Sequence, residues 1–440
     1  MAWLSSLIFV FVLGVAIFLF TRRIGVIRRN IQMGGEVKLE GSSAERWALM
    51  ARVALGQGKM TARPVAGIMH IIIYLGFVII NIEILEILID GLFGTHRVFS
   101  FLGPIYNALI ASFEVLAAGV LLACVVFLVR RNGMAIARFR SPEMKGWPSL
   151  DGNIILVVEV LLMFAFLSMN AADCIAQSRG LDTYVQAGAF PVSQWLIPLY
   201  SGLSDAGITM VERGMWWFHI VGVLAFLVYV PYSKHFHIML AFPNTWYASL
   251  LPQAALNNMA AVKKEVDLMM NPNADPYAAA PAGDEPPARF GVKDASDLTW
   301  VQLMQAYSCT ECGRCTSSCP ANQTGKKLSP RKIMMDTRDR IEEIGKSREA
   351  AGGKWEGDGK TLLGNYITEE ELWACTSCQA CVEACPILIS PMGIILDMRR
   401  SLIMEDSKSP ESITSMFNNI ENNGAPWAFP AAERGDWRTE

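Results

Sequence analysis

Residues 309–320 read CTECGRCTSSCP and residues 375–386 read CTSCQACVEACP, and this repeated pattern decides the fold of the C-terminal part of the chain. Each stretch spaces its cysteines as C-x2-C-x2-C-x3-C and follows the fourth with proline. Two-residue gaps let one tight loop present three sulfurs to three irons, and the proline then directs the chain away. We interpret each stretch as a binding loop for a [4Fe–4S] cluster.

The fourth cysteine of such a run binds the neighbouring cluster. The spacing therefore predicts two crossed ligand sets, Cys309, Cys312, Cys315 with Cys385, and Cys375, Cys378, Cys381 with Cys319. A pair of zinc sites is the alternative, but zinc sites use two C-x2-C pairs and need neither the third cysteine nor the proline. Two dense groups of cysteines also indicate a reducing compartment, not a disulfide framework. Cys124 and Cys174 lie apart, and we interpret them as ordinary buried residues.

Upstream of these motifs the chain is strongly apolar. The whole sequence is 52% hydrophobic yet still 18% charged, which suits a chain that is part membrane and part soluble. Apolar runs long enough to cross a hydrocarbon core of roughly 30 Å occupy residues 4–20, 65–89, 105–129, 154–169 and 215–230. With a net charge of −3, and no basic stretch apart from the membrane flanks, nucleic acid is not expected as a partner.

Positive charge alternates between the loops. The first and third loops carry nine and five Lys or Arg residues, whereas the second and fourth carry one and two. Because cytoplasmic loops hold the excess of Lys and Arg, we expect the N-terminus outside and everything after the fifth span in the cytoplasm. The first run has its positive charge after the apolar stretch, so it is predicted to be an anchor and not a cleaved signal peptide. The compartment expected is the inner membrane of a prokaryote.

These observations predict a mostly α protein, a five-helix transmembrane bundle followed by a small α-helical dicluster ferredoxin-like domain. The expected boundaries are 1–245 for the membrane domain, 246–290 for a linker, 291–405 for the cluster domain and 406–440 for an extended tail. Residues 271–291 are rich in Pro and Ala, as linkers are. A helix is expected over residues 330–344, and another is expected to start at Pro391.

Histidines lie near the ends of the predicted spans. His70 lies early in the second span and His237 at the inner end of the fifth, so their matched depth predicts that they clamp one b-type haem near the cytoplasmic face. His219 precedes His237 by 18 residues, which is five helical turns, so the two are predicted to share a helix face at opposite membrane surfaces. His219 has no histidine partner at its depth. His235 and His96 are interpreted as plain polar residues.

Residues 45–245 resemble the dihaem cytochrome b family of the nitrate reductase gamma subunit. The resemblance is carried by Gly-Gln-Gly-Lys-Met at 56–60, Arg-Pro-Val-Ala-Gly-Ile-Met-His at 63–70, Trp-Trp-Phe-His at 216–219 and Pro-Tyr-Ser-Lys-His-Phe-His-Ile at 231–238. It implies His70, His219 and His237 as haem ligands. The family's other second-helix histidine falls on Ile80 here, so a second haem, on His219, is left open.

The order of the two halves resembles the membrane-bound iron–sulfur oxidoreductases related to heterodisulfide reductase, which include the ETF–menaquinone oxidoreductases. Members of that group usually continue into a domain with two CCG motifs, and no Cys-Cys-Gly occurs in this sequence. The resemblance therefore implies that a separate CCG-domain iron–sulfur subunit is a partner. It also implies electron-transfer flavoprotein as a donor and a membrane quinone as substrate.

Acidic residues inside the predicted spans are candidates for proton or quinone chemistry. Glu83, Glu114 and Glu159 are costly to bury as charges, and buried carboxyl groups can carry protons. The alternative is that such acids only pair helices or reach toward the interface.

We expect an oxidoreductase subunit that passes electrons from a cytoplasmic redox partner through two clusters and b-type haem to menaquinone. Two alternatives remain. Electrons could run from quinol to a cytoplasmic disulfide or sulfur reductase. Alternatively, the chain could be a membrane anchor that carries electrons but has no substrate site of its own. The glycines between 352 and 359 match no nucleotide-binding fingerprint, so neither flavin nor NAD is expected on this chain.

Overall fold

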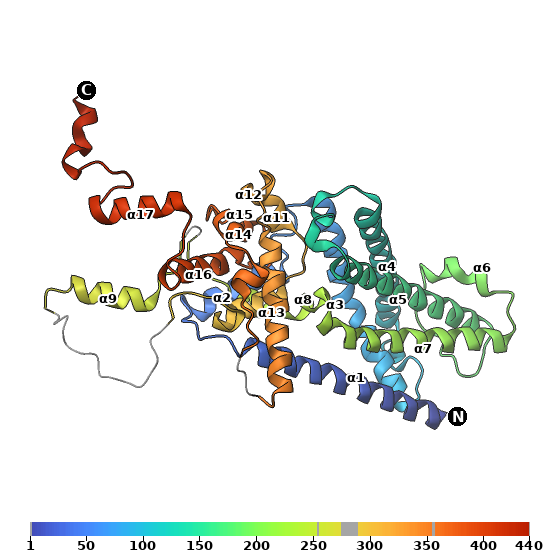
Figure 1. Cartoon of the computed structure of the whole chain (residues 1–440). Coiled ribbons are helices and arrows are strands. Elements are labelled where there is room, and N and C mark those ends of the chain that lie inside the picture. The colour runs from blue at the N-terminus through green and yellow to red at the C-terminus, as the bar shows by residue number, and fades with distance from the viewer. Residues whose placement is uncertain (1, 253–254, 274–288, 354–356, 440) are drawn as a thin grey trace.

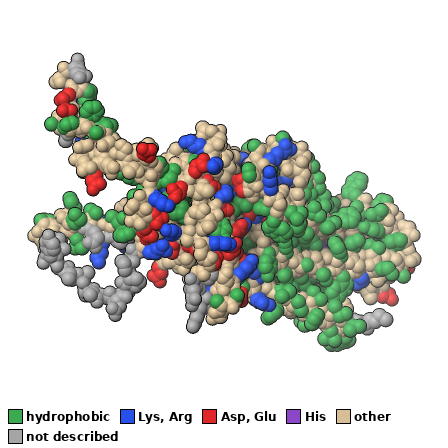
Figure 2. Space-filling model, viewed as in Figure 1, with side chains coloured by type: hydrophobic (Ala, Val, Ile, Leu, Met, Phe, Trp, Pro, Cys, Tyr) green, Lys and Arg blue, Asp and Glu red, His purple; other side chains and the backbone are tan. Residues whose placement is uncertain are grey.

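The computed structural model describes residues 2–252, 255–273, 289–353 and 357–439. These residues form helices and no strand, which confirms the predicted fold class. A bundle of long helices lies at one side, and the shorter helices of the cysteine-rich part pack against one end of it (Figure 1). Hydrophobic side chains cover the bundle, whereas charged side chains gather over the cysteine-rich part (Figure 2).

Among the described residues, five helices are long and apolar enough to cross a membrane, as the sequence predicted. They are α1 (Ala2–Ile31), α3 (Pro64–Phe93), α4 (Pro104–Leu128), α5 (Trp147–Ser178) and α7 (Asp205–Tyr229). Proline at the first position starts α3 and α4, where its missing N–H has no helical partner to lose. Ser204 caps α7 by accepting a hydrogen bond from the Gly207 amide.

The fourth span is longer than the expected residues 154–169. Helix α5 covers 32 residues, because polar groups that seemed to end the apolar run are buried inside the bundle. Asp151 accepts a hydrogen bond from the Tyr229 hydroxyl, and Asn170 and Asp173 both bond to Arg97. A membrane helix can continue through a polar residue whose hydrogen bonds are satisfied inside the bundle. A prediction from hydropathy alone therefore made the fourth span too short.

His219 and His237 do not lie on one continuous helix, so that prediction was wrong. Helix α7 ends at Tyr229, and the chain then makes 3-10 turns at Val230–Tyr232 and Lys234–Phe236. A separate helix, α8 (His237–Trp246), begins at His237 itself. Pro231 explains the break, because proline lacks the N–H that a continuing helix needs.

The cysteine-rich part is built from two similar units. In each, a threonine-capped helix precedes the cysteine motif: α10 (Trp300–Ser308) follows Thr299, and α14 (Glu369–Trp373) follows Thr368. A short helix then lies inside each motif, α11 (Arg314–Ser318) and α15 (Ala380–Ala384). Each motif leads to a longer helix that starts with a serine cap and proline, α13 (Pro330–Ala350) and α16 (Pro391–Met404). Both predicted helices are therefore present.

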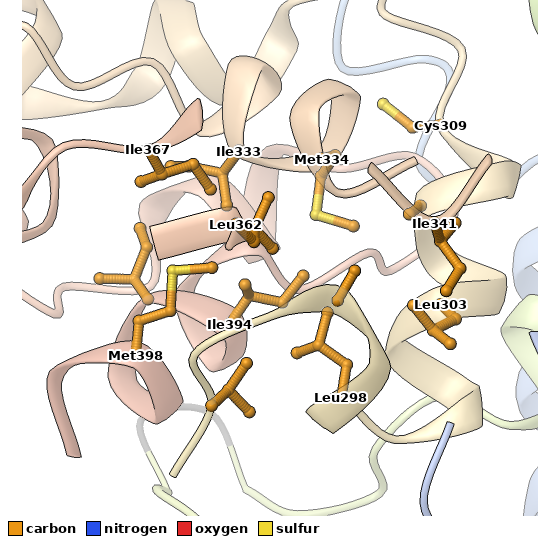
Figure 3. Close-up of a cluster of buried hydrophobic side chains, with 14 of the residues drawn as sticks. Leu298, Leu303, Cys309, Ile333, Met334, Ile341, Leu362, Ile367, Ile394 and Met398 are labelled. Atoms are coloured by element: carbon orange, nitrogen blue, oxygen red, sulfur yellow. The ribbon is translucent and has the colours of Figure 1, made fainter. Parts of the chain in front are cut away.

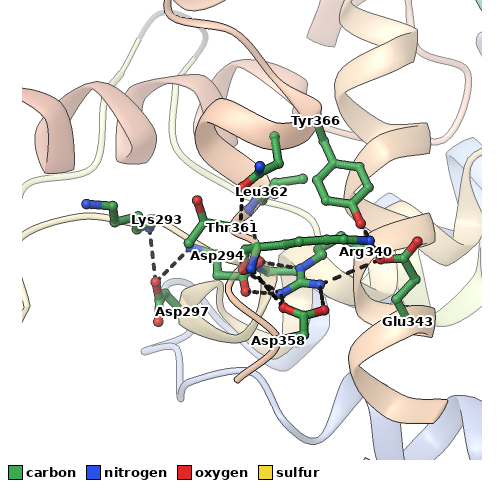
Figure 4. A network of polar contacts seen from close by, with 12 residues as sticks. Lys293, Asp294, Asp297, Arg340, Glu343, Asp358, Thr361, Leu362 and Tyr366 are labelled. Carbon is green, nitrogen blue, oxygen red and sulfur yellow. Dashed lines mark hydrogen bonds and ion pairs between the residues drawn. The ribbon is translucent and has the colours of Figure 1, made fainter. Parts of the chain in front are cut away.

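A hydrophobic core joins these helices, and it includes Leu298, Leu303, Ile341, Leu362 and Ile394 (Figure 3). Beside it, the fully buried guanidinium of Arg340 bonds to Asp294, Asp358 and the Lys360 carbonyl oxygen (Figure 4). These bonds tie α13 to the segments before α10 and before α14. The cysteine-rich part thus has a packed core of its own.

The same core continues into the membrane half. Ile27 of α1 and Val230 and Phe236 of the turns after α7 belong to the same buried cluster. Main-chain hydrogen bonds also cross the junction, from the Gly35 amide to the Leu298 carbonyl (2.8 Å) and from the Trp300 amide to the Gly35 carbonyl (3.0 Å). The two halves are therefore docked and not merely tethered.

The expected linker and tail contain helices. Helix α9 (Ala260–Met270) lies within the expected linker, and residues 274–288 of that linker lie outside the described residues. In the tail, α17 (Glu411–Asn423) and the 3-10 helix Ala431–Arg438 differ from the extended chain that was expected. Apolar residues of α17 recur at helical spacing, including Phe417 and Ile420, and the polar composition of the segment concealed this pattern.

Candidate functional site: two cysteine loops beside a histidine pair

The two cysteine motifs adopt the same backbone conformation. In the first, Glu311 and Gly313 have φ angles of +54° and +69°, and in the second Ser377 and Gln379 have +55° and +59°. These residues flank the second cysteine of each run at matching positions. A left-handed conformation costs a residue with a Cβ roughly 1–2 kcal/mol, so three of these four positions adopt it against their own preference. Such a repeat indicates two copies of one binding loop.

The fourth cysteine of each run lies with the other run, as the crossed sets require. Cys385 is within electrostatic reach of Cys309, Cys312 and Cys315. Cys319 is likewise within reach of Cys375 and Cys381. Cys315 of the first set is also within electrostatic reach of Cys381 of the second, so the two sets are neighbours.

The first set fits a group larger than one ion. Cys309, Cys312, Cys315 and Cys385 line a cavity together with Gly313, Arg331 and Pro386. Within the described ranges, no three His, Cys, Asp or Glu side chains converge closely enough to hold a single metal ion. A cubane places its sulfur ligands around a cluster of several atoms, and a cavity ringed by four sulfurs suits that requirement.

Burial raises the pKa of the cysteine thiols. It raises the pKa of Cys309 and of Cys381 to about 12 and that of Cys385 to about 11. Because the thiolate is the form that ligates a metal, these sulfurs need a cationic partner to lose their protons. Backbone amides already donate to one cysteine sulfur of each set, from Ile389 to Cys385 Sγ (3.3 Å) and from Ser377 to Cys375 Sγ (3.4 Å). Amide donors of this kind favour the charged sulfur.

The structure also brings His70 and His237 together, with ring centroids 6.3 Å apart. Two imidazoles that bind one iron from opposite sides, each with an Fe–N bond of about 2 Å, have centroids roughly 6 Å apart. His237 Nδ1 lies 3.1 Å from the Lys234 carbonyl oxygen and donates to it, which leaves Nε2 free for a metal. His70 Nδ1 is buried without a hydrogen-bond partner. These residues therefore fit a haem iron.

His235 is a neighbour that the sequence did not single out. Its ring lies edge-on to His237 with centroids 5.5 Å apart, and it also packs against Phe226 at 5.4 Å. The sequence signal for this neighbour was the His-Phe-His stretch at residues 235–237, in which one phenylalanine separates the two histidines. The two rings meet because His235 lies in the 3-10 turn Lys234–Phe236 and His237 begins α8, so the two residues do not follow one continuous helix.

His219 lies elsewhere, buried in the bundle with its ring against Phe166 at 6.0 Å. Its Nδ1 donates to the Leu162 carbonyl oxygen at 3.0 Å. The other four histidines of the chain are His96, between α3 and α4, and His70, His235 and His237, which lie together at the other end of the bundle. Ile80 packs in the same buried cluster as Trp216 and Ile220. His219 thus has the ring orientation of a ligand but no opposing imidazole.

The candidate carboxylates differ sharply in their surroundings. Both oxygens of Glu114 are satisfied, by Asn170 Nδ2 (3.1 Å) and by the amides of Val192 (2.8 Å) and Ser193 (3.0 Å). Glu83 is equally buried, but its Oε2 has no hydrogen-bond partner. Glu159 is half-buried in the middle of α5. Glu114 therefore has the contacts of a structural anchor, whereas Glu83 keeps an unpaired oxygen.

A buried polar network that the sequence did not reveal surrounds Glu83. Its centre is Arg97, which bonds to Asp173, to Tyr106 (3.0 Å) and to Asn170 (3.0 Å). The Tyr106 hydroxyl donates in turn to Glu86 at 2.8 Å. The charges of Arg97, Glu86, Glu114 and Asp173 all act on Glu83. One arginine thus serves several carboxyl groups, while Glu83 keeps an oxygen without a hydrogen-bond partner.

The first cysteine loop lies against the loop before α3. Arg314, between Gly313 and Cys315, donates to the Lys59 carbonyl oxygen at 3.0 Å, and its charge acts on His70. Arg63 donates to Ser317 Oγ at 2.6 Å. The first cysteine set and the histidine pair are therefore neighbours across the junction of the two halves.

Comparisons with known proteins agree with the cysteine motifs. Residues 308–389 match the family described as 4Fe-4S dicluster domain. Across 99% of its length the chain is 27% identical to the probable iron-sulfur-binding oxidoreductase FadF of Bacillus subtilis, and across 100% it is 27% identical to the EtfAB:quinone oxidoreductase of Syntrophomonas wolfei. It spans 61% and 60% of the lengths of these two relatives.

A shorter match, at 34% identity, is to one of the subunits of the ferredoxin/F(420)H(2)-dependent CoB-CoM heterodisulfide reductase of Methanosarcina acetivorans. It covers 26% of the chain and 56% of that relative. No solved structure matches the chain. The chain thus carries a 4Fe-4S dicluster domain and, among its described residues, five candidate membrane helices, and it is similar to EtfAB:quinone oxidoreductase and to heterodisulfide reductase subunits.

Proposed function

We propose that this chain passes electrons between a cytoplasmic redox partner and the menaquinone pool, with two [4Fe–4S] clusters and one b-type haem as carriers. The observation that carries the proposal is the placement of the first cysteine set beside the His70–His237 pair, through Arg314. An oxidoreductase that joins a soluble donor to a membrane acceptor needs such a junction.

The two cysteine sets have different access to solvent. Cys378 of the second set is exposed, whereas no cysteine of the first set is exposed and Cys309 is buried. In this proposal the second set faces a soluble partner, and the first set faces the membrane half. We propose a CCG-domain iron–sulfur subunit as that partner, and electron-transfer flavoprotein as the donor behind it. The name of the Syntrophomonas relative supports this direction.

In the membrane half, His70 and His237 would hold the haem, which supplies one-electron chemistry when bound. The His237–Lys234 hydrogen bond fixes the ring orientation that such ligation needs. For proton exchange with quinone we propose Glu83, because its unpaired oxygen is free to hold a proton. The distribution of Lys and Arg supports a cytoplasmic location for the cluster domain in a prokaryotic inner membrane.

The reverse direction, from quinol to a disulfide or sulfur reductase, is the second candidate. It is favoured by the match to the heterodisulfide reductase of Methanosarcina acetivorans. Electron-transfer flavoprotein genes beside this one would favour the first direction, and genes for sulfur enzymes would favour the second.

The haem is tested with purified full-length protein in lipid nanodiscs. Wild-type protein should show a low-spin b-type spectrum, and His70→Ala or His237→Ala should abolish it or convert it to high spin, because each removes one axial nitrogen. His96→Asn is the control, since His96 lies in the outer loop beside Tyr184. Absence of haem from the wild type, or a normal spectrum in both alanine variants, would refute this part of the proposal.

A further inference from the structure

An ion pair connects the first cysteine loop to the turn that carries His237. Lys234 Nζ lies 2.5 Å from Glu311 Oε2, and the two side chains are 10% and 3% exposed. Glu311 stands between Cys309 and Cys312, and Lys234 stands three residues before His237. Both side chains are buried at this contact, so each pairs with the other and not with solvent.

Each partner is anchored a second time within its own half. The Lys234 amide donates to Asp151 of α5 at 3.1 Å, and its ammonium group also donates to the Pro148 carbonyl oxygen. On the other side, Glu311 Oε1 accepts from Arg338 of α13 at 2.8 Å. The ion pair therefore connects α5 of the membrane half to α13 of the cysteine-rich part, because each of its side chains is also hydrogen-bonded to one of these helices.

Lys234 is also bonded to the histidine itself, because its carbonyl oxygen accepts the Nδ1 proton of His237. A continuous path thus runs from the left-handed turn at Glu311 (φ +54°), through Lys234, to the His237 ring. Displacement of Lys234 would move the cysteine loop and the imidazole relative to each other.

We propose that Lys234 and Glu311 are positioning residues that hold the first cysteine loop at a fixed place beside the His70–His237 pair. The inference rests on the proposed function for its consequence, which is rapid electron exchange between the two centres. Neither residue touches iron. Their contribution is to fix the distance and orientation of the groups that do.

The chain offers a matched control. Arg23 of α1 and Glu342 of α13 form another ion pair between the halves, at 2.8 Å, with side chains 13% and 15% exposed. This pair lies on helices and contains no residue of a cysteine motif or of the His237 turn. Arg23 also lies over the Tyr232 ring, 4.6 Å from its centroid, so its loss should weaken docking and disturb the neighbouring turn while the Lys234–Glu311 contact itself stays in place.

The experiment uses full-length protein in nanodiscs and compares Lys234→Met, Glu311→Gln, the double variant, Lys234→Arg and Arg23→Met. After flash reduction of the clusters, reduction of the haem is followed optically. Lys234→Met and Glu311→Gln should each slow it by roughly tenfold or more, since small misplacements of reacting groups already cost large factors in rate. Iron content and both static spectra should stay as in the wild type.

Coupling and rescue separate positioning from a general structural role. If the residues act through each other, the double variant is no slower than either single variant. Lys234→Arg should recover most of the rate, and Arg23→Met should leave it unchanged. A wild-type rate in Lys234→Met, additive slowing in the double variant, equal slowing in Arg23→Met, or loss of haem or iron in Lys234→Met would each overturn the proposal.

Hydrogen–deuterium exchange supplies a second readout that needs no haem. Lys234→Met should increase exchange in the loop 309–313 more than Arg23→Met does, because Lys234 forms an ion pair with that loop, whereas Arg23 forms its ion pair with Glu342 of α13. If wild-type protein contains no haem, the proposed function fails on that spectrum alone. The exchange comparison still decides whether the ion pair holds the loop, and equal exchange in the two variants would show that it does not.

Discussion

Removal of Cys385 tests the crossed ligand sets most directly. Cys385 belongs to the second motif in sequence but lies beside Cys309, Cys312 and Cys315 in space. Cys385→Ala should therefore destroy the cluster of the first motif and leave that of the second. Since each set serves one four-iron cluster, the iron content should fall from about eight to about four atoms per chain.

Accessibility identifies which cluster survives. Cys378 of the second set is exposed to solvent. In the first set no cysteine is exposed, and Cys309 is only 9% exposed. A chelator should therefore strip wild-type protein in two phases of equal amplitude, the faster from the second set. Cys385→Ala should keep only the faster phase. Cys319→Ala, the mirror-image variant, should keep only the slower one.

The assay combines iron determination with chelation kinetics and electron paramagnetic resonance of the reduced protein. Loss of the fast phase in Cys385→Ala, with the slow phase kept, would show that each motif binds its own fourth cysteine. Tightly bound zinc in place of iron would refute the cluster assignment altogether.

Three further predictions concern the frame around these centres. Arg340→Met should destabilise the cluster domain by on the order of 3–5 kcal/mol, because loss of the fully buried guanidinium leaves the carboxylates of Asp294 and Asp358 without their cationic partner, and pulse proteolysis of the full-length protein would measure it. Gly313→Ala should lower occupancy of the first cluster alone, measured by chelation amplitude, because the glycine has φ +69° and a Cβ there would lie 2.5 Å from Arg331 Nη1. A reporter fused after residue 440 should be active in the cytoplasm, and activity only outside would reverse the orientation.

The sequence predicted most of the architecture because its strongest signals are local. Apolar run length predicted the five spans, and the serine–proline start of α16 was visible at Pro391. The cysteine spacing likewise depends on a short loop. Errors arose where a distant partner changes the meaning of a residue, as at Asp151 and Asp173, whose hydrogen bonds let α5 continue beyond its apolar stretch.

The site was less predictable for the same reason. Depth matching placed His70 with His237, but the supporting argument from helix phase failed at Pro231. No pattern in the sequence connects Lys234 to Glu311, which are 77 residues apart. Hydropathy also gave no reason to distinguish Glu83 from Glu114. In the structure both carboxylate oxygens of Glu114 accept hydrogen bonds, whereas Glu83 Oε2 has no hydrogen-bond partner.

The left-handed residues of the cysteine loops have a consequence for the life of the protein in the cell. Glu311, Ser377 and Gln379 hold conformations that together cost roughly 3–6 kcal/mol, comparable with the whole stability of a small domain. Thiolate–iron bonds offset that cost only when clusters are inserted. The supply of iron would then determine what fraction of newly made chains fold with clusters and what fraction remain unfolded and accessible to proteases. Under iron starvation, newly made chains without clusters would therefore unfold more readily and be degraded faster.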